Sequence, residues 1–251
     1  MSIIIKTEEQ IDGIRKSCHL AVDTIDFLEE YIKPGVSTNQ LNQLADDFIK
    51  KYNGKSAALG YNGFPKSICT SLNDVICHGI PSDDNILKEG DVLKIDVCTI
   101  LNGFFGDTCK TFIVGESSEE IKKLVSTAKD CLDIGVSKVK PNTCFGEIGK
   151  AISNYANSKS FSVVYQFVGH GVGLQLHENP AVNHDDSFYN KELMLPGMVF
   201  TIEPMINQYK PDAVIMEDRW TAKTVDFGLS AQFEHTVLVT ETGVDVLTNQ
   251  L

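Results

Sequence analysis

The sequence predicts an α+β fold with two related halves in a single domain over residues 1–251. The first observation is that two amphipathic helices followed by strand-like segments occur twice along the chain. The second is that the two helix pairs align without gaps, so that Lys33-Pro34 falls on Lys140-Pro141. No Pro/Gly/Ser-rich linker separates two domains. We therefore expect halves at about 7–114 and 117–240, with a cleft where they meet.

The first helix pair is expected at the start of the chain. Residues 7–32 carry apolar positions at helical spacing, and Pro34-Gly35 ends this run. The pattern Ser37-x-x-Gln40 is typical of a capping box, which predicts that a second helix begins there. Its apolar face consists of Leu41, Leu44, Ala45 and Phe48.

The second helix pair is expected after residue 116. Ser117-x-x-Glu120 has the capping pattern again, and Lys140-Pro141 ends the helix that follows. The alignment then pairs Leu41 with Ile148 and Phe48 with Tyr155, which predicts a fourth helix. Any two amphipathic helices can be aligned somewhere, but a Lys-Pro breaker in register with both flanking helices favours an internal repeat.

Strands are expected between and after the helices, at 66–71, 91–101, 104–114, 163–169, 198–206 and 231–240. Asn102-Gly103 joins two of them and is a strong signal for a two-residue hairpin turn. This turn places 96 opposite 109 and 98 opposite 107, so Asp96 and Asp107 lie diagonally on one face. Their Cβ atoms are then about 7–8 Å apart.

That shared face also carries apolar residues, including Cys98 and Phe105. Two acids among apolar neighbours repel each other and are costly to bury unless a cation lies between them. A metal ion satisfies this requirement. A solvent-exposed face with ordinary surface aspartates remains an open alternative, and a one-residue slip in register would separate the pair.

Further candidate ligands occur in the second half. Glu203 lies inside the apolar run MVFTIEPMI, directly before Pro204, and Glu234 lies inside SAQFEHTVLV. The stretch FVGHGVGLQLHENP contains His170 and His177, two of only six histidines, and glycines beside His170 allow close backbone approach. Taken singly, each acid fits a strand edge or a solvent face, and each histidine fits a structural role.

Together, Asp96, Asp107, Glu203 and Glu234 bring four negative charges, and His170 brings a neutral nitrogen. Two divalent ions would neutralise this set, so its charge indicates a site for two metals. Oxygen ligands with one imidazole suit Mn, Fe or Co, with Zn less favoured. Such ions would deprotonate a bridging water and polarise a carbonyl.

Composition excludes several classes of function. The formal net charge of −12 argues against nucleic-acid binding. Only three consecutive isoleucines precede the first charged residue, too few for a signal peptide, and no apolar run is long enough for a membrane span. We therefore expect a cytoplasmic protein without membrane contact. The seven cysteines are odd in number and contain no C-x-x-C pair, so we expect reduced, mostly buried thiols.

The candidate ligands lie in short motifs whose order runs along nearly the whole chain. These are KIDV with Asp96, GDT with Asp107, GHGVG with His170, TIEPM with Glu203 and AQFEHT with Glu234. Matches at 60–81, with His78, and at 218–224, with Trp220, support them. The set resembles the type I methionine aminopeptidases of the bacterial kind.

This resemblance implies the pita-bread (creatinase/aminopeptidase) fold, in which pseudo-two-fold halves form a curved antiparallel sheet covered by helices. It implies removal of the initiator methionine from nascent proteins, with preference for a small second residue. The implied cofactors are two divalent ions, and the implied partners are nascent polypeptide N-termini and, transiently, the ribosome. A monomer is the family expectation, and no basic patch predicts the ribosome contact.

The resemblance also implies roles for individual residues. Asp96 would bind one metal, Asp107 and Glu234 would bridge, and His170 and Glu203 would complete the other. Glu203 would also be the general base. His177 would stabilise the scissile carbonyl as it becomes tetrahedral, and His78 would contact the amide nitrogen and assist the leaving amine. The residues that match positions lining the methionine pocket are Tyr61, Phe64, Cys69, His78, Leu176 and Trp220.

The chain departs from the family pattern at three positions. Leu174 stands where many bacterial members have a basic residue, Leu176 where others have an aromatic one, and Ala58 where a pocket cysteine is common. These changes alter the pocket but remove no proposed ligand. Two other interpretations stay open: an Xaa-Pro aminopeptidase or prolidase, which usually carries a further N-terminal domain, and an inactive binding protein of the same fold.

Overall fold

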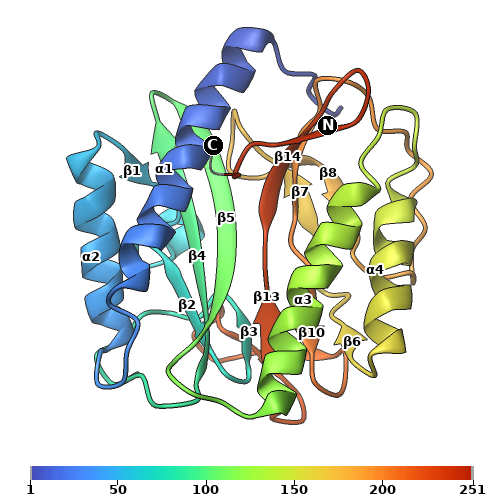
Figure 1. The fold of residues 1–251 in the computed structure, drawn as a ribbon. Coiled ribbons are helices and arrows are strands. Elements are labelled where there is room, and N and C mark those ends of the chain that lie inside the picture. The colour runs from blue at the N-terminus through green and yellow to red at the C-terminus, as the bar shows by residue number, and fades with distance from the viewer. Residues whose placement is uncertain (1, 250–251) are drawn as a thin grey trace.

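The computed structural model describes residues 2–249, and it confirms the α+β class (Figure 1). The α-helices are α1 (Glu8–Glu29), α2 (Thr38–Lys51), α3 (Glu119–Ser137) and α4 (Gly146–Ser158), with a short 3-10 helix at Tyr61–Gly63. The strands of the first half are β1 (Lys55–Ser56), β2 (Cys69–Leu72), β3 (Val75–Cys77), β4 (Val92–Leu101) and β5 (Phe104–Ile113). The remaining strands are β6 (Ser162–Val163), β7 (Gly169–Gly171), β8 (Glu178–Val182), β9 (Val199–Ile202), β10 (Met205–Asn207), β11 (Ala213–Ile215), β12 (Ala222–Thr224), β13 (Ser230–Gln232), β14 (His235–Val239) and β15 (Val244–Val246).

Three of the four α-helices, α1, α2 and α3, begin at a residue whose side chain caps the first turn, whereas α4 follows Phe145 without a side-chain cap. The predicted capping box of Ser37 and Gln40 is present at α2, and an unpredicted one, Thr7 with Gln10, opens α1. The prediction that Ser117 caps α3 is wrong by one residue. The hydroxyl of Ser118 accepts the hydrogen bond from the Ile121 backbone N–H instead, and the hydroxyl oxygen of the half-buried Ser117 has no hydrogen-bond partner among the described residues.

All strand pairings are antiparallel and form four sheets. The order β1-β4-β2, with β5 paired to β4, makes the sheet of the first half, and β15-β14-β9-β7-β8 makes the largest sheet of the second. Two small sheets, β13-β10-β6 and β11-β12-β3, complete the molecule. The predicted hairpin register is confirmed, because Asp96 pairs with Cys109 and Cys98 with Asp107.

Three predicted strands are interrupted in the structure. The segment 198–206 divides into β9 and β10 at Glu203-Pro204, and 231–240 divides into β13 and β14 at Phe233-Glu234. Only the ends of 163–169 pair, as β6 and the first residue of β7. Strand geometry is lost at Glu203 because Pro204 cannot donate to a ladder. At Glu234 the backbone instead forms a bridge to Cys109.

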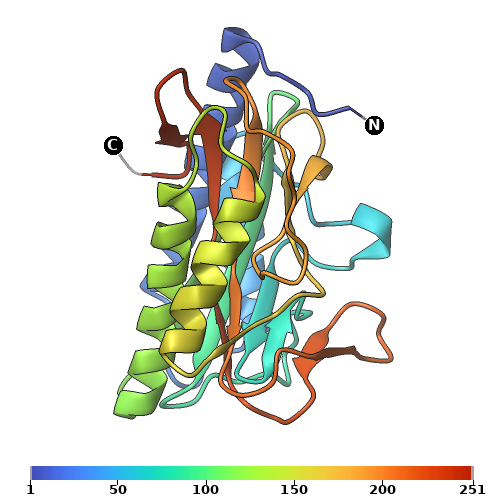
Figure 2. The same cartoon turned by 90° about the vertical axis from the view of Figure 1, so that its right-hand side faces the viewer.

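The helices cover one face of the sheets, and loops project from the other, including the 3-10 helix and the β11–β12 hairpin (Figure 2). Buried side chains of α1 and α2, such as Leu28 and Leu41, pack on Leu93 of β4. A second cluster joins α3 and α4 to β9, with Ile152 and Phe200 at its centre. One core under each helix pair is what the proposed duplication at about 7–114 and 117–240 requires, and the duplication itself stays a prediction.

All seven cysteines are free thiols, and all but Cys144 are buried. No helix within residues 2–249 has the length and apolar character that a membrane crossing needs.

Candidate active site

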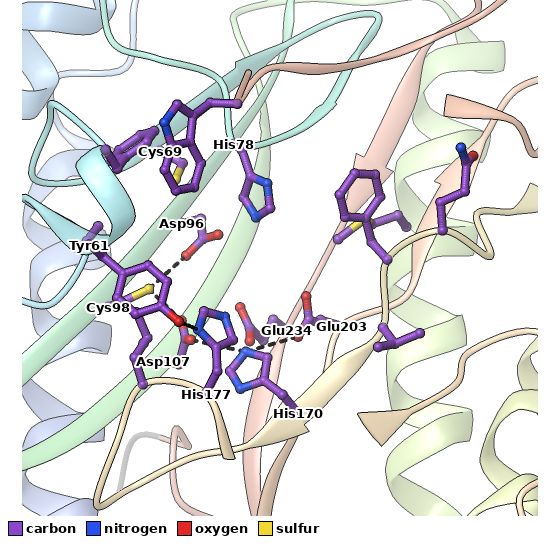
Figure 3. Close-up of a pocket in the computed structure, with 18 residues that line it drawn as sticks. Tyr61, Cys69, His78, Asp96, Cys98, Asp107, His170, His177, Glu203 and Glu234 are labelled. Atoms are coloured by element: carbon purple, nitrogen blue, oxygen red, sulfur yellow. Dashed lines mark hydrogen bonds and ion pairs between the residues drawn. The ribbon is translucent and has the colours of Figure 1, made fainter. Parts of the chain in front are cut away.

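The five predicted metal ligands converge on one cavity of ≈ 390 Å³ between the two halves (Figure 3). Asp96 and Asp107 come from the β4–β5 hairpin, and His170 comes from β7. Glu203 and Glu234 lie in the two strand breaks. The predicted substrate and catalytic residues Tyr61, Phe64, Cys69, His78, Leu176, His177 and Trp220 also line this cavity. Predictions made from separate motifs thus meet at one place.

The hairpin carboxylates are held by an unbroken antiparallel ladder. The thiol of Cys98 lies between them, with Sγ 3.1 Å from Asp107 Oδ1 and 3.6 Å from Asp96 Oδ1. The sequence placed Cys98 on this face only as an apolar neighbour. Since Cys98 and Asp107 are directly opposite in the predicted register, the contact could have been expected from it.

The glutamates are positioned differently, by bonds made where their strands break. At Glu203 the backbone N–H donates to His184 Nε2 at 3.1 Å, and the Thr201 hydroxyl donates to Oε1 at 2.7 Å. At Glu234 the backbone N–H donates to the Cys109 carbonyl at 2.9 Å, which ties the break between β13 and β14 to β5 of the other half. The site therefore spans both halves through backbone contacts.

His170 presents its Nε2 atom to the carboxylates. Its Nδ1 lies 3.0 Å from the Gly171 carbonyl, and its backbone N–H donates to the Thr201 hydroxyl at 2.9 Å. Because Nδ1 donates to a carbonyl in this arrangement, the lone pair is on Nε2, which lies 3.7 Å from Asp107 Oδ2 and 3.6 Å from Glu203 Oε1. Glycine is required beside it, since a Cβ on residue 171 would lie 2.2 Å from the Asn179 carbonyl oxygen.

Burial of so many acids strongly disfavours their charged forms. Burial raises the pKa of Asp107 to about 6 and raises the pKa values of Asp96, Glu203 and Glu234 well above the ordinary range. It lowers the pKa of His170 to about 3, so the imidazole is neutral. Within residues 2–249, neither lysine nor arginine lines the cavity. The carboxylates thus lack a compensating protein cation.

The donor set fits divalent metal ions. Two groups of three ligand atoms lie within 4.8 Å of one another: Asp96, Cys98 and Asp107 in one, and Asp107, His170 and Glu234 in the other. Asp107 belongs to both groups, and Glu203 belongs to neither. Oxygen-rich ligation with a neutral imidazole suits Mn, Fe, Co or Zn.

Two further histidines stand at the cavity beside the carboxylates. The ring of His177 lies 4.1 Å from that of His170, and its Nδ1 is 2.7 Å from the Tyr61 hydroxyl. His78 has a φ of 56° and packs edge-on against Phe167 and Trp220. Burial lowers the pKa of His78 to about 4 and also lowers the pKa of His177, so both rings are neutral near pH 7 and can act as hydrogen-bonding groups.

The remaining wall of the cavity is apolar. Phe64 meets Trp220 in an edge-to-face contact at 5.2 Å, and Cys69 packs with them. Ala58 and Leu176 line the cavity, so these two departures from the family pattern bear directly on its shape, whereas Leu174 is absent from its lining. The lining residues that the sequence analysis missed are Cys98, Gln166, Phe167, Val168 and Met205. Each lies within four residues of a predicted ligand in the chain: Cys98 near Asp96, the segment 166–168 near His170, and Met205 near Glu203.

Comparison with known proteins gives consistent results. The chain matches the model of metallopeptidase family M24 over residues 12–241. It is 48% identical over 251 residues to the methionine aminopeptidase of Buchnera aphidicola, covering 100% of this chain and 95% of that protein. It is 45% identical over 249 residues to that of Escherichia coli, covering 99% of this chain and 94% of that protein.

Solved structures agree. The crystal structure of methionine aminopeptidase from Rickettsia prowazekii matches with a TM-score of 0.96 at 42% identity, covering 99% of this chain and 100% of that one. A prolidase from Pyrococcus furiosus matches with a TM-score of 0.77 at 25% identity, and this chain covers 66% of it.

Proposed function

Since the chain belongs to metallopeptidase family M24 and to its methionine aminopeptidases, with their pita-bread fold, we propose that it removes the initiator methionine from nascent proteins in the cytoplasm. The observation that carries this proposal is the convergence of four buried carboxylates and His170 on one cavity with an apolar aromatic wall. We expect the protein to act as a monomer on emerging N-termini, in transient contact with the ribosome.

We propose that Asp96, Asp107, His170, Glu203 and Glu234 hold two divalent ions, with Asp107 and Glu234 shared. When bound, the ions supply activation of water to hydroxide near neutral pH and polarisation of the scissile carbonyl. Asp107 supports a shared role by belonging to both groups of close ligand atoms. The four positive charges of two divalent ions would balance the four negative charges of the carboxylates.

Protein side chains then transfer protons and orient the substrate. Glu203 accepts the proton that the attacking water gives up, and burial suits this role because it raises the pKa of this carboxylate. His177, held by the Tyr61 hydroxyl, donates to the carbonyl oxygen as it becomes tetrahedral. His78, from the opposite side of the cavity, contacts the amide nitrogen and assists the leaving amine.

The apolar wall explains selection of methionine. A thioether side chain is polarisable and packs well on aromatic edges and sulfur, which Phe64, Trp220 and Cys69 provide. Tyr61 and Leu176 complete the lining. We propose that the second residue of the substrate must be small, as in the family.

The prolidase-like alternative is less well supported. The chain is 25% identical to the Pyrococcus furiosus prolidase, with a TM-score of 0.77, but 42% identical to the Rickettsia prowazekii methionine aminopeptidase, with a TM-score of 0.96. An inactive binding protein is disfavoured because all five proposed ligands line the cavity. Neither alternative explains an apolar wall of aromatic rings and a thiol beside the carboxylates as directly as methionine removal does.

The test is release of free methionine from Met-Gly-Met-Met and Met-Leu-Met-Met by chelator-stripped protein, with Co or Mn added back in steps. We expect metal-dependent cleavage of the first peptide and little cleavage of the second. A saturation curve with two equivalents of metal would support the dinuclear proposal. Folded protein that releases no methionine with any metal would contradict the proposed function.

A further inference from the structure

A buried ion pair links the first residues of the chain to the site. Lys6 precedes α1, and its ammonium contacts the carboxylate of Glu178, the first residue of β8. The two side chains are only 1% and 3% exposed. The pair joins positions 172 residues apart in sequence, and neither residue lines the cavity.

Glu178 also holds the loop between β7 and β8 from inside. Its Oε1 accepts hydrogen bonds from the backbone N–H groups of Leu174 at 2.7 Å and Gln175 at 2.9 Å. This loop carries Leu176 and His177, both of which line the cavity. One carboxylate therefore fixes the loop at two amides and, through Oε2, fixes it to Lys6.

The N-terminal segment is itself held in place at this contact. The Lys6 backbone N–H donates to the Gly197 carbonyl at 2.8 Å, and α1 begins two residues later. The loop packs closely on both elements at Gly173, whose φ is +133°. A Cβ there would lie 2.3 Å from Ile14 Cδ1 and 3.3 Å from Lys6 Cε, so the Lys6 stem is part of the surface on which the loop rests.

The buried charges make the position of the β7–β8 loop depend on both Lys6 and Glu178. A buried carboxylate without its cation is strongly unfavourable, and it regains solvation only if the loop opens or the group becomes neutral. Either change weakens the two bonds to the loop amides. The long-range pair of Arg15 and Asp245 differs, because its side chains are 32% and 41% exposed and water can replace either partner.

We infer that Lys6 and Glu178 are positioning residues that hold the β7–β8 loop in the arrangement in which His177 and Leu176 face the substrate. The inference rests on the role proposed above for His177. It assigns a function in catalysis to the segment before α1, which contributes no lining side chain within the described part of the chain.

The primary test is Lys6→Met, which keeps the length of the stem and removes the charge, with Arg15→Met as the matched control. We expect Lys6→Met to lower kcat by up to about a hundredfold, because small displacements of a catalytic group are costly. Metal content should stay at the wild-type level, since the five proposed ligands lie outside this loop. Arg15→Met should leave kcat unchanged.

Two double variants separate positioning from general destabilisation. In a His177→Ala background, Lys6→Met should lower kcat much less than it does in the wild type, because the group being positioned is gone. Lys6→Met with Glu178→Gln should recover activity relative to Lys6→Met alone. The amide oxygen of glutamine still accepts from the loop, and no uncompensated charge is buried.

Hydrogen exchange supplies a readout independent of activity. The amides of residues 173–178 should exchange faster in Lys6→Met than in wild type, and Arg15→Met should not change them. Faster exchange in a protein that releases no methionine even as wild type would support the hold on the loop and contradict only the proposed function. Unchanged exchange, or a lowered unfolding temperature with unchanged kcat, would overturn the inference.

Discussion

The two halves of the molecule present their carboxylates in opposite ways. In the first half, Asp96 and Asp107 belong to a continuous ladder between β4 and β5. In the second half, Glu203 and Glu234 lie where the strands stop, at the β9–β10 and β13–β14 breaks. A ladder aims side chains by backbone register alone. Where a strand breaks, the backbone no longer determines on which side the side chain lies. Hydrogen bonds from other residues must then hold it in place.

Those bonds come from residues outside the ligand set. The Thr201 hydroxyl contacts both His170 and Glu203. The Thr108 hydroxyl donates to the Glu234 carbonyl at 2.8 Å, and the Thr236 hydroxyl donates to the Asp107 carbonyl at 2.7 Å. Threonine hydroxyls therefore join the second half to the continuous β4–β5 hairpin, which we expect to be the more rigid of the two regions.

Glu203→Gln removes a base and a ligand charge from the break while keeping side-chain shape. We expect turnover to fall by about 10²–10⁴-fold, the usual contribution of a general base. The measurement is methionine release at saturating metal, with circular dichroism to confirm the fold. Glu217→Gln, at an exposed acid, is the control and should have wild-type turnover. Comparable turnover in the Glu203 variant would remove this residue from the mechanism.

Thr201→Val tests whether the break depends on its supporting hydroxyl. The variant loses a donor to Glu203 and an acceptor for His170, and we expect metal affinity or activity to fall about 10–100-fold. Thr99→Val is the matched change in the ladder, where the hydroxyl donates to the Ser17 carbonyl. It should lower the free energy of unfolding by about 1 kcal/mol without changing kcat. If Thr201→Val and Thr99→Val lowered kcat equally, the break would depend on its supporting hydroxyl no more than the ladder does.

Removal of metal should increase local opening of the backbone at the β9–β10 and β13–β14 breaks more than in the β4–β5 ladder. The stabilisation that metal gives should depend on pH. Burial raises the pKa of Asp107 from 3.8 to about 6, so across this interval the folded metal-free protein binds more protons than the unfolded chain. Stability of the metal-free protein therefore falls as pH rises through this window. Added metal, which binds the deprotonated carboxylates, should raise the unfolding temperature more at about pH 7.5 than at about pH 5.5.

Hydrogen exchange at the two pH values would locate this loosening. Amides at 203–207 and 233–236 should exchange faster after chelation, whereas those at 92–101 should change little. A stabilisation by metal that does not depend on pH would contradict the assignment of buried acids as ligands. Uniform exchange across the three segments would show that the hairpin is no more rigid than the breaks.

The same contrast explains how far sequence reasoning reached. The Asn102-Gly103 turn allowed the register of the hairpin to be predicted correctly, because a two-residue loop between alternating strands implies one pairing. The continuous strand expected at 231–240 was wrong, because the contact that interrupts it is the long-range bridge from Glu234 to Cys109. The role of Thr201 was also invisible, since its partners His170 and Glu203 are gathered only by the fold. Local patterns carry no information about such contacts.

Gly103→Ala should have the smallest effect, confined to stability. Gly103 has a φ of 86°, and a Cβ there would meet no atom within 4 Å, so the cost arises only from the left-handed backbone. We expect the free energy of unfolding to fall by about 1 kcal/mol, measured in urea. Gly243→Ala, also in open space but without a positive φ, is the control and should be nearly neutral. Metal content and kcat should not change in either variant, since Cys98 and Asp107 stay opposite each other through the rest of the ladder. A loss of metal from Gly103→Ala would mean that the turn alone sets the register and that the ladder is not a self-sufficient platform.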